Sequence, residues 1–264
     1  MDTLVNNPWP LGLMTLIFLG CVIELGRYTA DHAHIQEDPH RKEQMVALRD
    51  GMFVLVGLLV GFTLALAAAR YAERRSLRVE EANAIGTTYL RAQTLPSPVG
   101  DEAQELLKQY VNAKLEWDDA GFDASRKAVA ENQTKQIQDR LWKDIVEVTK
   151  TDRSAISAAY MNSLNQVIDL DEERVSALEN RIPISVWILI FSVSAIAVFT
   201  RGLTLVRRFW LTTLLAPLTI AIVVALIADL DTPSRGLIRL DHRALLRLRS
   251  DLRKDPSPLT IPDP

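Results

Sequence analysis

The sequence predicts an all-α, polytopic membrane protein with four transmembrane helices in two hairpins and a helical soluble insert between the second and third spans. Four apolar blocks of roughly 16–20 residues are each long enough to cross a bilayer. The insert carries apolar side chains at helical spacing and lacks the alternation of a strand. We place the first transmembrane pair, the insert, the second transmembrane pair and the C-terminal segment at 1–69, 70–181, 182–230 and 231–264.

Composition and charge narrow the class of protein further. The 264 residues carry a net charge of −3 and no basic tract, which argues against a nucleic-acid partner. Cys21 is the single cysteine, so an intramolecular disulfide and a cysteine-based zinc site are excluded. The chain shows no Gly-rich phosphate loop and no nucleophile–base arrangement. We therefore expect neither a cofactor nor an enzyme.

The first span is predicted over residues 11–28. It lacks the basic start of a secretory signal and is followed by a second span, so we expect the helix to be retained. Glu24 lies three residues before Arg27, and a helix lets these two side chains pair. Pairing lowers the cost of a carboxylate near the end of a membrane span.

A charged connector is predicted over residues 29–51. It contains His32, His34 and His40 among carboxylates, and these side-chain types could supply zinc or copper ligands. Their spacing matches no established metal motif, so we expect a solvated acidic loop and predict no metal site. Whether the three histidines bind metal stays open.

The second span (52–69) continues to Arg91 without a helix breaker, which predicts a rod of about 40 residues and roughly 60 Å. One face carries small residues that permit close packing: Gly57, Gly61, Ala65 and Ala68. The opposite face carries polar residues: Thr63, Arg70, Arg74, Glu81 and Thr88. We hypothesise that the small face packs on a neighbour and the polar face lines a water-filled pathway. Ordinary membrane packing and an arginine anchor at the membrane surface are the alternative.

Pro96 and Pro98 end the rod, and the insert follows. Thr151 is expected to be an N-cap, and the acidic run 169–174 is interpreted as a solvent-exposed helix face. Together with the end of the rod, the helices of the insert are expected to pack as a soluble bundle. The predicted helices are 101–120, 123–149 and 151–181.

The third span is predicted over 184–199 and the fourth over 209–228. Pro183 suits the first turn of the third span, and Pro217 is expected to kink the fourth. Their connector is short, so we expect an antiparallel hairpin. A basic amphipathic segment, 239–253, is expected either to lie on an anionic membrane face or to cap the soluble bundle.

Arginines near the ends of the spans predict the orientation. More of them flank the side that carries both termini and the insert, so the positive-inside rule places that side in the cytoplasm. We expect a bacterial inner membrane.

Two segments carry a family resemblance, VEEANAIGTTYLRAQTLP at 79–96 and ADLDTPSRGLIRL at 228–240. With the order of two spans, a helical insert and two more spans, they make the chain resemble the bestrophin-like family of bacterial and plant membrane proteins. Bestrophins are oligomeric channels with cytoplasmic termini, and their second span lines the pore with a narrow apolar neck. The resemblance implies a homo-oligomer in the lipid bilayer and a permeant inorganic ion.

The motif residues of this resemblance have two interpretations each. Those on the rod form either a polar belt or gating contact on a conduction path, or a helix-packing contact: Glu81, Asn83, Gly86 and Thr87. Asp229 and Asp231 are either cation ligands or the boundary of the fourth span. A carboxylate near a helix C-terminus needs a partner, for which we expect an arginine such as Arg235.

The leading functional prediction is an oligomeric ion channel whose pore is lined by the second span and its extension. An apolar stretch would gate by dewetting. The pore and gate candidates are Phe53, Phe62, Thr63, Arg70, Arg74 and Glu81. The arginines favour anions and Glu81 favours cations, so the sign of the ion stays open.

Two other arrangements are compatible with the sequence. The first is a non-conducting membrane sensor or scaffold whose cytoplasmic helices recruit a partner. The second is a proton-driven, stator-like unit, which would need a partner that carries a titratable group.

Overall fold

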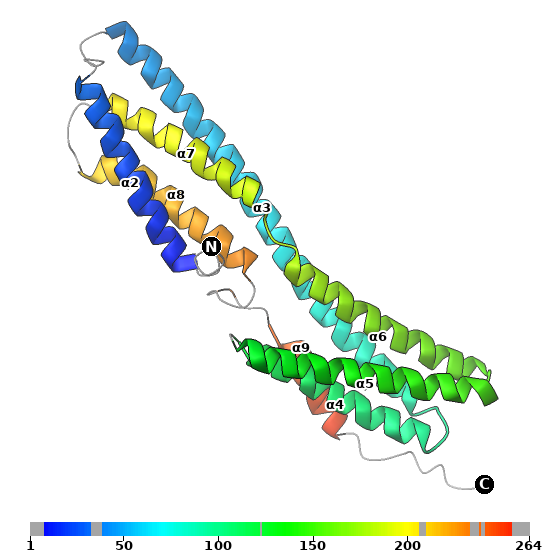
Figure 1. The fold of residues 1–264 in the computed structure, drawn as a ribbon. Helices are drawn as coiled ribbons and strands as arrows, with labels where there is room; N and C mark the ends of the chain where they lie inside the picture. The colour runs from blue at the N-terminus through cyan, green and yellow to red at the C-terminus, as the bar shows by residue number, and fades with distance from the viewer. Residues whose placement is uncertain are drawn as a thin grey trace. The chain divides into compact units, whose positions relative to one another are not determined.

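The computed structural model describes residues 8–32, 39–121, 123–205, 210–232, 238 and 241–254. In these residues the secondary structure is helical and contains no strand, which confirms the all-α prediction. Figure 1 shows the helices in chain order. They are α2 (Pro8–His32), α3 (Pro39–Ala92), α4 (Val99–Asp119), α5 (Ala124–Thr151), α6 (Ala155–Glu179), α7 (Ile184–Thr204), α8 (Trp210–Asp231) and α9 (Arg243–Lys254).

Four helical stretches of the described chain are long and apolar enough to cross a membrane, as the sequence predicted. In the third of them, residues 180–183 separate α6 from α7. The stretches are Trp9–His32, His40–Ala92, Ala155–Thr204 and Thr213–Asp231.

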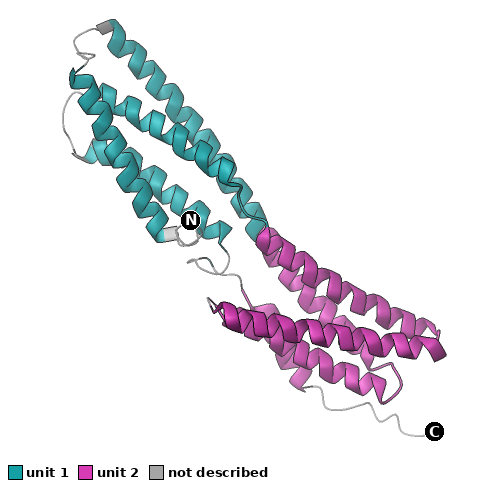
Figure 2. Ribbon diagram, viewed as in Figure 1, with its two compact units in different colours: residues 1–71, 180–239 teal, residues 72–179, 240–264 magenta. Residues whose placement is uncertain are grey.

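The chain divides into two compact units, coloured separately in Figure 2. Unit 1 consists of residues 1–71 and 180–239, and contains α2, α7, α8 and the first part of α3. Unit 2 consists of residues 72–179 and 240–264, and contains the rest of α3 with α4, α5, α6 and α9. α3 is thus the helix that belongs to both units.

α3 is longer than predicted. It begins at Pro39 and has 54 residues, which correspond to about 80 Å. Because α2 also continues to His32, the loop predicted over 29–51 is wrong for most of its length. The residues after Pro39 are rich in strong helix formers, and proline suits a first helical turn, which explains the difference.

Unit 1 is held together by α2, which packs along both α7 and α8. The backbones of α2 and α7 approach most closely at two glycines. A Cβ atom on Gly26 would lie 2.3 Å from the carbonyl oxygen of Phe199, and one on Gly202 would lie 2.4 Å from that of Ile23. Only glycine permits this crossing. Buried apolar side chains complete the core, including Leu19, Ile190, Val198, Val224 and Ile227.

Unit 2 has its own apolar core. α4 packs against α5 and α9, and α5 packs against α6. Leu245 and Leu252 of α9 are buried in this core, so α9 caps the bundle, which was one of its two expected positions. The core also includes Ile85, Leu107, Tyr110, Leu141, Ile145 and Leu164.

The turn between α5 and α6 differs from the prediction. Thr151 is the last residue of α5 and not the N-cap of α6. The oxygen Oγ of Ser154 accepts a hydrogen bond from the backbone N–H of Ser157 at 3.3 Å, and the N–H of Ser154 donates to Oδ1 of Asp152 at 3.0 Å. Ser154 therefore caps α6, because α5 continues for two residues beyond its predicted end at 149 and includes Thr151.

Candidate functional site

α3 carries one continuous line of exposed side chains. The positions follow one another at intervals of three or four residues, which places them on one side of a helix. We call this line the exposed stripe. It consists of Val54, Leu58, Phe62, Ala65, Ala69, Ala72, Ser76, Glu80, Asn83 and Thr87, all of which are exposed in the protomer.

The chemistry of the exposed stripe changes along its length. From Val54 to Ala72 the side chains are apolar, and the largest of them, Phe62, is 67% exposed. From Ser76 to Thr87 they are polar, and the hydroxyl of Ser76 donates a hydrogen bond of 2.7 Å to Oε1 of Glu80. A membrane-length apolar line therefore continues into a polar one on the same side of one helix.

The opposite face of α3 is buried inside the protomer. Thr63 and Thr88 each donate to the backbone carbonyl four residues earlier, at 2.8 Å. Nε of Arg74 donates to the carbonyl oxygen of Ala177 at 2.9 Å, and this arginine is only 2% exposed. Four residues predicted to line a pathway, Thr63, Arg70, Arg74 and Glu81, thus lie on the side of α3 that packs within the protomer.

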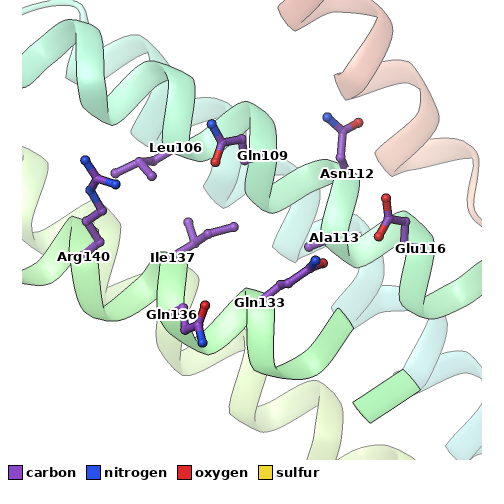
Figure 3. A pocket seen from close by; sticks show the side chains of 9 residues that line it. All are labelled: Leu106, Gln109, Asn112, Ala113, Glu116, Gln133, Gln136, Ile137 and Arg140. Atoms are coloured by element: carbon purple, nitrogen blue, oxygen red, sulfur yellow. The ribbon is translucent and has the colours of Figure 1, made fainter. Parts of the chain in front are cut away.

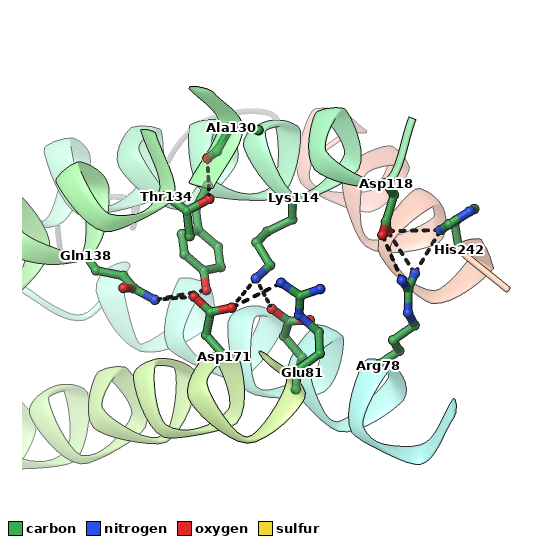
Figure 4. A network of polar contacts seen from close by, with 11 residues as sticks. Arg78, Glu81, Lys114, Asp118, Ala130, Thr134, Gln138, Asp171 and His242 are labelled. Carbon is green, nitrogen blue, oxygen red and sulfur yellow. Dashed lines mark hydrogen bonds and ion pairs between the residues drawn. The ribbon is translucent and has the colours of Figure 1, made fainter. Parts of the chain in front are cut away.

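Glu81 lies in a buried network of charges in unit 2, drawn in Figure 4. Its oxygens lie 2.9 Å from Nζ of Lys114 on α4 and 3.5 Å from Nε of Arg174 on α6. Asp171 pairs with the same two cations, with Lys114 closely and with Nη2 of Arg174 at 3.3 Å. Nε2 of Gln138 donates to Oδ2 of Asp171 at 2.9 Å. Two carboxylates and two cations balance each other here.

The pKa values in this network show how the charges stabilise one another. Burial favours a protonated Asp171, but Lys114 and Arg174 outweigh it and lower the pKa of this carboxyl. Burial opposes the charge of Arg174, yet Glu81 and Asp171 raise the pKa of the guanidinium. Burial and then the neighbouring carboxylates raise the pKa of Tyr110 well above its ordinary value. Both shifts of the paired groups, that of Asp171 and that of Arg174, favour the ionised form inside the bundle.

A second buried pair joins α3 to α4 and contacts His242, the residue before α9. Arg78 donates to both oxygens of Asp118, at 2.7 and 2.8 Å. Nδ1 of His242 lies 2.9 Å from Oδ2 of Asp118 and 2.8 Å from Nη1 of Arg78 (Figure 4). Burial would raise the pKa of Asp118, but the contact with His242 and the charge of Arg78 lower it to about 2.

The two aspartates of the second motif bind the backbone at the end of α8. Asp229 accepts a hydrogen bond from the N–H of Ile238 at 3.1 Å, and Asp231 accepts one from the N–H of Ile182 at 3.2 Å. Nη1 of Arg70 lies 3.9 Å from Oδ1 of Asp231. The expected arginine partner is thus Arg70, whereas Arg235 lies outside the described residues.

The remaining predicted residues separate into exposed and covered positions. The small face predicted on the second span is exposed, and apart from the adjacent residues and backbone of α3 itself no described atom lies within 4 Å of a Cβ placed on Gly57 or Gly61. Phe53 is partly buried and packs against the core of unit 1. A Cβ on Gly86 would lie 3.3 Å from Cδ1 of Leu248, so α9 covers this glycine.

The histidines of the predicted connector lie at the ends of two different helices or outside the described residues. His32 lies at the end of α2, with Nδ1 2.8 Å from the carbonyl oxygen of Tyr28, and His34 lies outside the described residues. His40 is exposed near the start of α3. Among the described residues there is no group of three or more His, Cys, Asp or Glu side chains that could hold a metal ion.

Sequence reasoning missed the partners of Glu81. The run 169–174 was interpreted as solvent-exposed, but Asp171 and Arg174 are buried. A signal was present in the spacing: Lys114 lies four residues after Tyr110 and seven after Leu107, on the apolar face of α4. A lysine at such a position needs a buried anion.

The comparisons with known proteins identify the family of this chain. The family model described as the bestrophin-like domain matches residues 42–245. The chain belongs to the bestrophin-like family. The matched region contains the exposed stripe, the Glu81 network and both aspartates of the second motif. No curated protein matches this bestrophin-like chain.

Solved structures resemble this bestrophin-like chain in fold. Three of them are point mutants of a bacterial bestrophin homologue from Klebsiella pneumoniae. A tryptophan-to-alanine mutant has a TM-score of 0.66 at 13% identity, over 91% of this chain and 96% of its own. An aspartate-to-alanine mutant has a TM-score of 0.66 at 13% identity, over 91% and 99%. An isoleucine-to-threonine mutant has a TM-score of 0.65 at 14% identity, over 90% and 99%.

The helices of unit 2 in the bestrophin-like chain also carry open grooves. Figure 3 shows one of about 400 Å³ between α4 and α5, where amide side chains and Arg140 surround Leu106 and Ile137. Another, of about 540 Å³, lies beside the exposed Trp142 and Val146. Both grooves are lined by residues of α4, α5 and α6 and by none of the exposed stripe.

Proposed function

We propose that this bestrophin-like protein is a subunit of an oligomeric ion channel whose pore is lined by the exposed stripe of α3. The observation that carries the proposal is the stripe itself. An apolar line of membrane length turns polar on the same side of one helix, while the opposite side is occupied by internal contacts. The bestrophin-like family and the fold of the bacterial bestrophin homologue support a channel.

The pore face proposed here differs from the polar face predicted from sequence. Arg74 and Glu81 are buried and bound inside the protomer, so they are not available to an ion unless unit 2 opens. Leu58 and Phe62, one helical turn apart and both more than half exposed, would form an apolar constriction that gates by dewetting. Phe62 is therefore retained from the predicted gate residues, and Phe53 is not.

The proposal also includes the arrangement of the spans and the termini across the membrane. The four spans pair as two hairpins, with both termini and unit 2 in the cytoplasm of a bacterium and the spans in its inner membrane. The arginine distribution supports this orientation because more arginines flank the side of unit 2. The permeant species is an inorganic ion, and the channel is a homo-oligomer.

Ion flux from proteoliposomes tests the pore face. Phe62→Ala shortens an exposed apolar side chain, so we expect flux to rise because a wider constriction wets more readily. Phe53→Ala is the matched control. Its partly buried ring packs on the core of unit 1, so its loss should lower thermal stability and leave flux per folded protein unchanged.

The outcomes of this flux experiment separate the proposals. Equal flux from both variants and the wild type would remove Phe62 from the pore but keep the channel. The absence of flux from folded, oligomeric wild-type protein would overturn the channel. A non-conducting scaffold is the second candidate function, favoured by the groove beside Trp142 and Val146, and it predicts that absence.

A further inference from the structure

The charged side chains of α3 between residues 70 and 81 are distributed unevenly around the helix. Three of the four arginines between residues 70 and 78 lie on or beside the buried face and form ion pairs or hydrogen bonds within the protomer, whereas Arg75 is exposed. Arg70 lies 3.9 Å from Asp231, Arg74 donates to the carbonyl of Ala177, and Arg78 forms a bidentate pair with Asp118. Their charges are therefore directed into the protein and partly neutralised there.

The exposed stripe, in contrast, contains no arginine. Among its ten residues, all of which the structure describes, Glu80 is the one that carries a charge. Glu73, one residue from the stripe, is exposed as well and also acidic. The stripe itself therefore presents negative charge just beyond the apolar line, although four arginines lie within the same helical turns and one of them, Arg75, is exposed one residue from Ser76.

Glu80 is also held in position. Its Oε1 accepts the 2.7 Å hydrogen bond from the hydroxyl of Ser76, one turn earlier on the stripe. This bond fixes one rotamer of a long side chain and leaves Oε2 for another ligand. Asn83 and Thr87 follow at intervals of three and four residues and add carbonyl and hydroxyl oxygens to the same line.

We propose that Glu80, positioned by Ser76, selects inorganic cations over anions as they pass along the exposed stripe. In a homo-oligomer each copy contributes one such carboxylate, and a ring of carboxylates favours cations in a channel. Carboxylate, hydroxyl and amide oxygens are the ligands of hard cations. The inference rests on the proposed channel function and gives the sign of its ion.

Reversal potentials of the full-length protein in planar bilayers, measured across a potassium chloride gradient, test this assignment. We expect the wild type to reverse on the cation side. Glu80→Gln should lower the potassium-to-chloride permeability ratio by roughly fivefold, the factor given by one unit charge at about 4 Å in water. Glu80→Lys should invert the preference. Ser76→Ala should lower the ratio by a smaller factor, because it releases the carboxylate without removing it.

The matched control is Glu172→Gln, which removes the same charge from an exposed position on α6. It should leave the permeability ratio unchanged. An anion-preferring wild type, or a Glu80→Lys channel with unchanged preference, would overturn the role of Glu80 while the channel stands. If the wild type carries no current, the channel and the selectivity assignment both fail.

Discussion

Glu80 and Glu81 are neighbours in the sequence and have opposite environments. Glu81 is fully buried and contacts cations on two other helices. Glu80 is exposed, and its hydrogen-bond partner is Ser76 on its own helix. The difference shows that a polar side chain on a helix leaving the membrane is not by itself a sign of a conduction path. It is such a sign only where the side chain is not already paired with other residues of the same protomer. The two faces of α3 differ in this respect along most of their length.

Truncation of the buried Glu81 should have the largest effect of the predicted changes on stability, and it tests the comparison with Glu80 most strongly. Glu81→Ala leaves Lys114 and Arg174 with an excess of buried positive charge, so we expect a loss of about 3–5 kcal/mol in the free energy of unfolding. Denaturant unfolding in detergent micelles, followed by circular dichroism, measures it. Glu80→Ala is the control and should change stability by less than about 0.5 kcal/mol. Similar losses for the two variants would refute the division of α3 into a structural and an exposed face.

The pH dependence of stability probes the same buried face through Asp118, the partner of Arg78. Its pKa is lowered from 3.8 to about 2 in the folded protein. A lowered acid pKa stabilises the fold above pH 3.8, and this stabilisation of roughly 2 kcal/mol disappears as the pH falls toward 2. The advantage of the wild type over Asp118→Asn in unfolding experiments should therefore shrink between these pH values. A constant difference would contradict the ion pair, and the exposed Asp169→Asn serves as the control.

Much of the fold could be predicted because it depends on local sequence. The continuous rod needed only the absence of a breaker between 52 and 91, and its end needed only Pro96 and Pro98. The start of α3 was missed because a charged sequence after Pro39 suggested a loop, although its residues favour a helix. Charge alone does not separate a solvated helix from a solvated loop.

Only part of the candidate site could be predicted from the sequence. Helical geometry correctly grouped Thr63, Arg74 and Glu81 on one side of α3. Which side of α3 is buried within the protomer depends on Lys114 and Arg174. These residues lie 33 and 93 positions beyond Glu81 in the sequence. Such distant pairing is invisible to periodicity within one helix. The small residues show the same limit, because the glycines that bring α2 and α7 together in unit 1 are Gly26 and Gly202.

Thiol labelling tests the central claim, that the exposed stripe lines the pore, most directly. Cys21 is the single native cysteine, so Cys21→Ser gives a background in which one new thiol can be placed at a time. Ser76→Cys and Asn83→Cys lie on the stripe, and the exposed Val129→Cys on α5 is the control. We expect a bulky charged thiol reagent to block ion flux through the two stripe variants and to leave the labelled Val129→Cys channel conducting. Complete labelling of the stripe cysteines with undiminished flux would contradict the account.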